Sequence, residues 1–172
     1  LQNIPAKGPW GLRLRSAFVP EKPGWLIMAA DYSQIELRVL AHLSGDPELI
    51  NDFQTDRDVH QATADELGIS RDFAKTINFG IIYGISDFGL AKSLGIKKTE
   101  AAVIIQKYFA RHKGVKAFIE KTIKAAKENG YVETLLGRKR PMPDINSPHA
   151  GLRSAAERMA INAPVQGTAA DM

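Results

Sequence analysis

The chain has 172 residues, of which 44% are hydrophobic and 24% are charged. This composition is ordinary for a globular protein with one hydrophobic core, so a single domain is the first expectation. The formal net charge of +4 mildly favours an acidic partner such as nucleic acid. The absence of cysteine excludes disulfides and thiolate chemistry, and no apolar run approaches the ~20 residues needed to cross a bilayer. We expect an intracellular, soluble protein with no membrane partner.

Both ends of the chain are unusual for natural termini. The first residues, LQNIPAKGPWG, contain no Met, and the last, VQGTAADM, lie in a helical pattern that has no Gly or capping residue. These features predict an excised fragment of a longer protein.

The first thirty residues have the pattern of strands and turns. LRLRSAFVP alternates apolar and polar residues, and GWLIMAA is a short apolar run typical of a buried strand. Asp31 follows that run directly. Ser33 then precedes Glu36 by three residues, which is typical of a capping box, and apolar residues recur at helical spacing after them. The predicted order is strand, Asp31, helix.

Helical patterns dominate residues 47–130, and most of them end on Gly. They predict a small helical subdomain. After it, YVETLLGRKRPMPDI is typical of a strand, a Gly-centred turn and an edge strand interrupted by Pro141 and Pro143. A last helix is expected to start near His149 and to kink at the internal Pro164.

Within RDFAKTINFGIIYG, helical spacing aligns four residues along one side. Residues four apart in an α-helix lie nearly above one another, so this stripe comprises Arg71, Lys75, Phe79 and Tyr83. The two cations suit a polyphosphate, because Arg has a planar donor fork and Lys a mobile charge. The two aromatic rings offer flat surfaces for a base or sugar. Together they favour a nucleotide lying along the helix, with its phosphates toward the helix N-terminus.

The alternative for this helix is purely structural. Phe73, Ile77 and Ile81, with Ala74 beside them, form an apolar back suited to packing. The two cations would then be part of a solvated turn, and the two aromatic residues of the stripe would be ordinary. The complete stripe is harder to explain without a nucleotide.

Two further residues are weaker candidates on their own. Asp31 suits Mg²⁺, which takes one or two carboxylates and completes its shell with phosphates and water, but an Asp before a helix is also a common cap. His60 could donate to a phosphate or be a surface residue. No His or carboxylate spacing indicates zinc.

Polar residues near the C-terminus leave two interpretations open. Arg158, Asn162 and Gln166 recur at four-residue steps, and amide side chains can bind acceptors in the DNA minor groove. They could equally form an exposed polar face. The sequence GRKR, residues 137–140, could contact phosphates or form a soluble turn.

The longest motifs resemble those of a known family. DYSQIELRVLAHLSGD resembles motif A of family A DNA polymerases, the bacterial DNA polymerase I type, and RDFAKTINFGIIYG is similar to their motif B, R-x-x-x-K-x-x-x-F-G-x-x-Y-G. LQNIP, GYVETLLGRKR and AERMAINAPVQGTAAD also resemble that family, so the resemblance covers essentially the whole chain.

The resemblance implies an α+β, mainly helical fold, consisting of the fingers subdomain and flanking palm strands of a right-hand polymerase. It divides the chain into a palm piece with motif A at 1–44, helical fingers with the motif B helix at 45–130, and a hairpin and helix returning to the palm at 131–172.

The resemblance also implies roles at the metal and phosphate end of a site. Asp31 and the backbone of Tyr32 would bind two Mg²⁺ ions. Arg71, Lys75 and His60 would hold the phosphates of the incoming dNTP, and Asp31 and Lys75 would be the catalytic residues of this chain.

At the sugar and base end, the resemblance implies that Phe79 stacks near the nucleotide and that Tyr83 closes the template-base position. Glu36 would pair with Tyr83 and crowd the place of a ribose 2′-OH, so that it selects deoxyribose. The residues implied to follow the primer-template duplex are Arg158, Asn162 and Gln166.

The implied function is that of a DNA-directed DNA polymerase, a nucleotidyltransferase of DNA replication and repair. The primer 3′-OH would attack the α-phosphate of a dNTP in a two-Mg²⁺ mechanism. The implied partners are primer-template DNA, dNTPs and the remainder of the palm and thumb. A monomer in the bacterial cytoplasm, associated with the nucleoid, is expected.

The chain departs from the family pattern in two places. The family's second metal-binding carboxylate lies in a later His-Asp motif, and no His of this chain precedes Asp. One protein ligand of the Mg²⁺ ions is therefore expected to be missing, and the fragment alone to be inactive. In addition, DELGISRDFAK joins its two helices by a shorter connection than is usual in the family. The alternative function is a non-catalytic, nucleic-acid-binding helical module.

Overall fold

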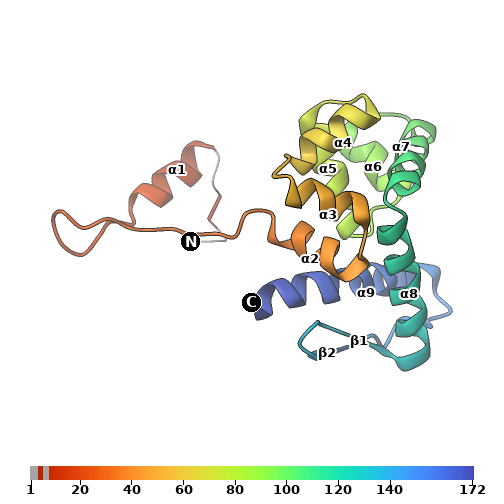
Figure 1. Cartoon of the computed structure of the whole chain (residues 1–172). Coiled ribbons are helices and arrows are strands. Elements are labelled where there is room, and N and C mark those ends of the chain that lie inside the picture. The colour runs from red at the N-terminus through yellow and green to blue at the C-terminus, as the bar shows by residue number, and fades with distance from the viewer. Residues whose placement is uncertain (1–3, 6–7) are drawn as a thin grey trace. The chain divides into compact units, whose positions relative to one another are not determined.

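The computed structural model describes residues 4–5 and 8–172, which belong to two compact units. The first unit extends to Ser33, and its described part contains helix α1 (Pro9–Ser16). The second runs from Gln34 to Met172 (Figure 1). Its elements are α2 (Ile35–Ser44), α3 (Pro47–Gln54), α4 (Val59–Leu67), α5 (Arg71–Ile82), α6 (Asp87–Leu94), α7 (Lys98–Arg111), α8 (Lys113–Asn129), β1 (Tyr131–Glu133), β2 (Lys139–Pro141) and α9 (Ala150–Asp171). The fold is mainly helical, as predicted.

The strand prediction for LRLRSAFVP is wrong, because helix α1 covers most of this segment. Pro9 occupies the first turn, where its missing N–H costs nothing. The Arg15 side chain donates hydrogen bonds to the carbonyls of Ile4 and Pro5, at 2.7 and 3.2 Å. These bonds hold the helix against the chain that precedes it. The resemblance of LQNIP falls partly on residues outside the described ones.

The predicted buried strand GWLIMAA is also wrong. Residues 24–30 form neither helix nor strand, and the side chains of Leu26 and Met28 are 92% and 90% exposed. A strand needs a neighbour to pair its backbone groups, and the described part of the first unit offers none. An apolar run alone therefore does not make a strand here.

The second unit has one main helical core, to which α2, α5 and α9 contribute buried side chains. Leu37 and Leu40 of α2, Ile77 and Ile82 of α5, and Val165 of α9 are fully buried. Because these three helices share a core, their polar faces are fixed relative to one another. The predicted apolar back of α5 is confirmed in part, since Phe73 is exposed.

Helix α2 begins differently from the prediction. Its N-cap is Gln34 in a left-handed conformation, with φ 52°, and the Gln34 side chain makes no capping hydrogen bond. The prediction placed Ser33 at the N-cap, so it is wrong about the capping residue, and the Glu36 carboxylate accepts a hydrogen bond from Tyr83. Within residues 47–130, the predicted glycine stops are confirmed at the ends of α4, α6 and α8, whereas the stop predicted at Gly114 is wrong because Gly114 lies inside α8.

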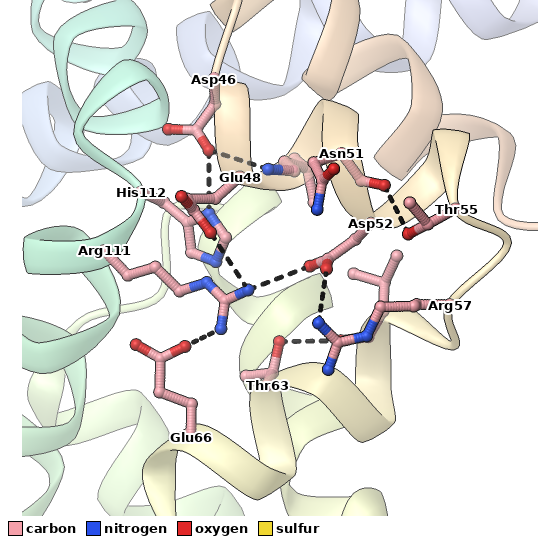
Figure 2. Close-up of polar contacts among 12 residues, drawn as sticks. Asp46, Glu48, Asn51, Asp52, Thr55, Arg57, Thr63, Glu66, Arg111 and His112 are labelled. Carbon is pink, nitrogen blue, oxygen red and sulfur yellow. Dashed lines mark hydrogen bonds and ion pairs between the residues drawn. The ribbon is translucent and has the colours of Figure 1, made fainter.

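A buried polar cluster joins α3 to the junction of α7 and α8, as Figure 2 shows. Asp46 caps α3 by accepting from Leu49 N at 3.0 Å, and it also accepts from Gly114 N at 2.8 Å and lies 3.0 Å from His112 Nδ1. Burial opposes ionisation of Asp46, but the hydrogen bonds from His112, Leu49 and Gly114 outweigh it and lower its pKa. Burial lowers the pKa of His112, against the opposing effect of Asp46. We infer a neutral His112 that donates to an ionised Asp46.

Arg111 extends this cluster toward α4. Its guanidinium lies 3.3 Å from Asp52 and 3.6 Å from Glu48, and it also pairs with Glu66 (Figure 2). Three helices, α3, α4 and α7, are thus joined through one arginine. None of these residues was singled out from the sequence.

The C-terminal part of the chain follows the prediction closely. β1 and β2 pair antiparallel, with Val132 opposite Arg140, and the turn contains Gly137 at φ 83°. α9 starts directly after His149 and continues past the buried Pro164. The kink at this proline stays a prediction. None of the described helices is long and apolar enough to span a membrane.

Candidate functional site

Three helices meet at the hydroxyl group of Tyr83. It donates a hydrogen bond to Glu36 Oε2 at 2.9 Å, and the side chain of Gln166 on α9 is also within hydrogen-bonding reach. Burial raises the pKa of Tyr83, Glu36 raises it further, and the hydrogen bond with Gln166 opposes the rise. The phenol therefore stays a neutral donor that holds the Glu36 carboxylate in place. The contact between Glu36 and Tyr83 implied by the family resemblance is present.

A row of flat rings leads from Tyr83 along α5. The rings of Phe79 and Tyr83 are stacked, with centroids 6.5 Å apart and an angle of 19° between planes. The ring of His60 lies 5.6 Å from Phe79, tilted by 44°. The row combines two residues of the predicted stripe with one from the start of α4. The row presents the apolar ring faces of Tyr83 and Phe79 at one end and the ring nitrogens of His60 at the other.

His60 is buried, with 3% of its surface exposed, so the surface interpretation of this residue is wrong. It is accommodated because Asn78 Nδ2 lies 3.0 Å from its Nδ1. Burial lowers the pKa of His60, and the positive charges of Arg71 and Lys75 lower it further, against the effect of Asp58. The imidazole is therefore neutral at neutral pH.

The two cations of the stripe have different surroundings. Arg71 Nε and Nη2 donate to Asp58 Oδ2 at 2.9 and 2.6 Å. Lys75 is exposed, and no ion pair of its side chain occurs among the residues that the structure describes. Both lie on the first half of α5, where the helix dipole favours anions. The ammonium group of Lys75 is thus available to a ligand, whereas the guanidinium of Arg71 is already paired with the carboxylate of Asp58.

Asp58 was missed in the sequence, although its position just before a helix is a recognisable capping signal. Its Oδ1 accepts from His60 N at 2.9 Å and from Gln61 N at 3.1 Å, which caps α4. Burial opposes ionisation of Asp58, but Arg71 and the two backbone donors together outweigh it and lower its pKa. The capping carboxylate therefore joins the starts of α4 and α5.

The polar residues of α9 do not form a uniformly exposed face. Arg158 and Gln166 are exposed, and Arg158 Nη1 donates to Ser154 Oγ at 2.9 Å. Asn162 is half-buried, and its Oδ1 is fully enclosed without a hydrogen-bond partner among the described residues. The interpretation as a simple solvated face therefore fails at Asn162.

The basic turn GRKR is largely satisfied within the chain. Arg138 pairs with Asp171 at 2.7 Å and donates to Gly167 O at 2.9 Å. Lys139 pairs with Glu133 at 3.3 Å. These contacts fit the interpretation as a turn fixed against α9.

Asp31 and Tyr32 belong to the first compact unit, and both are exposed. Within residues 4–5 and 8–172, no group of three or more acidic or histidine side chains is arranged to hold a metal. The candidate metal ligands are therefore one carboxylate and a neighbouring backbone carbonyl. This donor set fits Mg²⁺, which takes few protein ligands and completes its shell with substrate phosphates and water.

Comparison with known proteins places these motifs in context. The family model described as DNA polymerase family A matches residues 1–172. The chain is 51% identical to DNA polymerase I of Bacillus caldotenax and 52% identical to the thermostable DNA polymerase I of Thermus aquaticus, in both cases over 100% of the chain. It spans 21% and 22% of these relatives, about a fifth of their length.

A solved structure is also similar. The POL domain of Pol1 from M. smegmatis, in complex with DNA primer-template and dNTP, matches with a TM-score of 0.89 and 41% sequence identity. The match covers 99% of the chain and 32% of that protein.

Proposed function

Because the chain belongs to DNA polymerase family A, we propose that it forms the nucleotide-selecting part of a template-directed DNA polymerase. The observation that carries the proposal is the ordered row on and beside α5, from Lys75 through Phe79 to the Tyr83–Glu36 pair. We also propose the division into a palm piece at 1–44, fingers at 45–130 and a return to the palm at 131–172. Its partners would be primer-template DNA, dNTPs and the rest of the palm and thumb.

The phosphates of the dNTP bind at the start of α5. Lys75 contributes an open positive charge, and Arg71 contributes its donor fork by exchanging part of its bond with Asp58 for a phosphate oxygen. The neutral ring of His60 adds a hydrogen-bond donor. These groups compensate the negative charge that develops when the primer 3′-OH attacks the α-phosphate and pyrophosphate leaves.

The sugar and base lie toward the end of α5. Phe79 stacks near them, and Tyr83 occupies the template-base position. Glu36 selects deoxyribose by crowding the 2′ position, and the hydrogen bond from Tyr83 supports this role because it restrains the carboxylate. A restrained group excludes a 2′-OH more effectively than one that can turn away.

Asp31 and the Tyr32 carbonyl would hold the Mg²⁺ ions of the reaction. Bound Mg²⁺ supplies charge neutralisation at the attacking oxygen and at the leaving pyrophosphate. This chain contains one carboxylate of the site, so we propose that it has no useful activity alone. Robust Mg²⁺-dependent primer extension by the purified chain would contradict this.

The side chains of Arg158, Asn162 and Gln166 follow the primer-template duplex. The exposed side chains of Arg158 and Gln166 support a polar ligand along this face of α9, whereas the Oδ1 of Asn162 is enclosed and does not add to this support. Minor-groove contacts of this kind read base identity only weakly, which suits a polymerase that must accept every sequence.

The decisive experiment is primer extension by a family A polymerase whose corresponding segment has been replaced with this chain. An Asp31→Ala version serves as control. We expect extension that disappears in the control. A folded chimera that binds DNA but does not extend the primer would favour the non-catalytic binding module.

A further inference from the structure

Asn78 lies on a buried side of α5, next to the predicted stripe, and only 1% of it is exposed. Its amide nitrogen lies 3.0 Å from His60 Nδ1, 3.2 Å from Thr63 Oγ1 and 3.4 Å from the Val59 carbonyl. All three partners belong to α4. One buried amide therefore connects the two helices that carry the phosphate end of the proposed site.

The contacts determine which way the amide points. The Val59 carbonyl can only accept, so the Asn78 atom that faces it has to be the nitrogen. The same nitrogen faces His60 Nδ1 and can only donate to it. His60 Nδ1 is therefore the acceptor, and the proton of the neutral ring resides on Nε2.

His60 Nε2 is the nitrogen left for a ligand. No hydrogen bond of this atom occurs within the described part of the chain. Nor is it among the four side-chain polar atoms there that are fully enclosed without a partner. The atom therefore reaches solvent, although the rest of the ring is buried.

We propose that Asn78 is a positioning residue that holds His60 in the neutral Nε2–H tautomer, so that Nε2 donates a hydrogen bond to a phosphate oxygen of the incoming nucleotide. The proposal rests on the proposed function, in which His60 contacts the triphosphate. It explains why a buried amide accompanies a histidine next to two cations. Without the amide, the ring would spend part of its time with the Nε2 lone pair facing the anion, which repels it.

Burial and the nearby cations favour a neutral ring. Burial disfavours a protonated imidazolium most, Asp58 at the start of α4 favours one, and Arg71 and Lys75 on α5 disfavour it. Since the ring is neutral, the tautomer decides whether it attracts or repels a phosphate. Asn78 selects the attracting form.

The first test is the tautomer itself, measured by long-range ¹H–¹⁵N NMR of the histidine rings in the 172-residue chain at about pH 7.5. We expect a protonated Nε2 and an unprotonated Nδ1 for His60. In Asn78→Leu both nitrogens should shift toward the values of a tautomer mixture. A protonated Nδ1 in the unmodified chain overturns the proposal.

The second test is binding of Mg²⁺–dTTP, followed by NMR titration. Asn78→Leu should weaken binding about three- to tenfold, the effect of one hydrogen bond to an anion. His60→Ala should weaken it by a similar factor, and the double variant should be no weaker than His60→Ala. Asn51→Leu, at an exposed position of α3, is the matched control and should bind like the unmodified chain.

The two hypotheses fail in different ways. If His60→Ala leaves dTTP binding unchanged, His60 does not contact the phosphates as the proposed function states. The positioning role of Asn78 is then wrong as well. If His60→Ala weakens binding but Asn78→Leu does not, the proposed function stands and the positioning role is overturned.

Should Asn78→Leu fail to fold, Asn78→Asp replaces it in the tautomer measurement. This variant keeps the shape of the side chain but presents an acceptor to the ring. We expect Nδ1 to become protonated, with His60 remaining an imidazolium to higher pH than in the unmodified chain. An Nδ1 that stays unprotonated shows that residue 78 does not control the ring.

Discussion

Tyr83 and Glu36 are 47 positions apart in the sequence, and the Tyr83 hydroxyl donates to the Glu36 carboxylate at 2.9 Å. This hydrogen bond ties the end of α5 to the first turn of α2. Because Tyr83 is 39% exposed, the bond should contribute modestly to stability.

We expect the Tyr83–Glu36 pair to be energetically coupled by about 1 kcal/mol. Urea unfolding of Tyr83→Phe, Glu36→Ala and the double variant measures this coupling. The double variant should lose less stability than the two single losses added together. Strict additivity would mean that the hydrogen bond does not contribute in solution.

The same pair should control sugar selection in the chimeric polymerase. Glu36→Ala should raise ribonucleotide incorporation strongly, because it removes the carboxylate. Tyr83→Phe should raise it to a smaller extent, because the Glu36 carboxylate remains but loses the hydrogen bond that restrains it. Single-nucleotide incorporation of a dNTP and the matching rNTP gives the ratio for each variant. Unchanged ratios in both variants would be incompatible with the proposed role of Glu36.

Gly84 should tolerate alanine poorly. Its φ of 63° is left-handed, and an added Cβ would lie 3.0 Å from Arg158 Cγ and 3.2 Å from Ile161 Cδ1 on α9. Gly95 has nearly the same φ, 68°, with nothing within 4 Å, so Gly95→Ala measures the backbone cost alone. We expect Gly84→Ala to cost at least about 1 kcal/mol more than this control in urea unfolding. Equal losses of stability in the two variants would show that the side chains of α9 move aside for the extra methyl group.

Asp58 has two separable effects. Asp58→Ala removes the cap of α4 and should cost about 1 kcal/mol of stability, whereas Asp58→Asn keeps a capping oxygen and should cost less. Both variants release Arg71 from its ion pair, so Mg²⁺–dTTP affinity should rise about two- to fivefold. Thermal unfolding and NMR titration separate the two effects. A fall in affinity would mean that the pair orients Arg71 for the ligand.

Acidification should destabilise the chain through His112. Its folded pKa lies below the ordinary value of 6.5, so the unfolded state binds more protons as the pH falls through 6.5, and stability decreases. Between pH 6.5 and 5.5 the loss can reach about 1 kcal/mol for each such histidine, and the pKa of His60 shifts in the same direction. The stability from Asp46, whose pKa is lowered from 3.8, is lost only at still lower pH.

Urea unfolding at about pH 7.5 and pH 5.5 tests this expectation. His112→Asn keeps a donor toward Asp46 but cannot titrate, so it should reduce the difference between the two pH values. His42→Asn, at an exposed position of α2, should leave the difference unchanged. A pH dependence unaffected by His112→Asn would assign the effect to other groups.

The sequence predicts α5 well because helical spacing is a local property. Four residues could be aligned from the spacing alone, and α5 contains three of them, Arg71, Lys75 and Phe79, while Tyr83 is the C-cap directly after it. The contact of Tyr83 with Glu36 could not be derived in this way, since it depends on how α2 packs against α5. It was expected only from the resemblance to the family.

The residues that were missed are polar groups whose partners lie on other helices. Asn78, Asp58 and His112 each satisfy a partner on another helix, and nothing in the local pattern reveals such a partner. The predicted strands at 12–20 and 24–30 failed for a related reason. Strand formation depends on a second strand, and the apolar pattern of one segment cannot supply it.

Because only residues 68–70 connect α4 to α5, we expect the two helices to move together. The two helices are joined through the chain, through the Asp58–Arg71 ion pair and through the buried amide of Asn78. The far end of α5, by contrast, is held to α2 by the Tyr83 hydroxyl. A displacement that begins at Tyr83 would therefore move both helices together. A dye pair on α2 and α4 would then report a movement of α5 without any label on α5 itself.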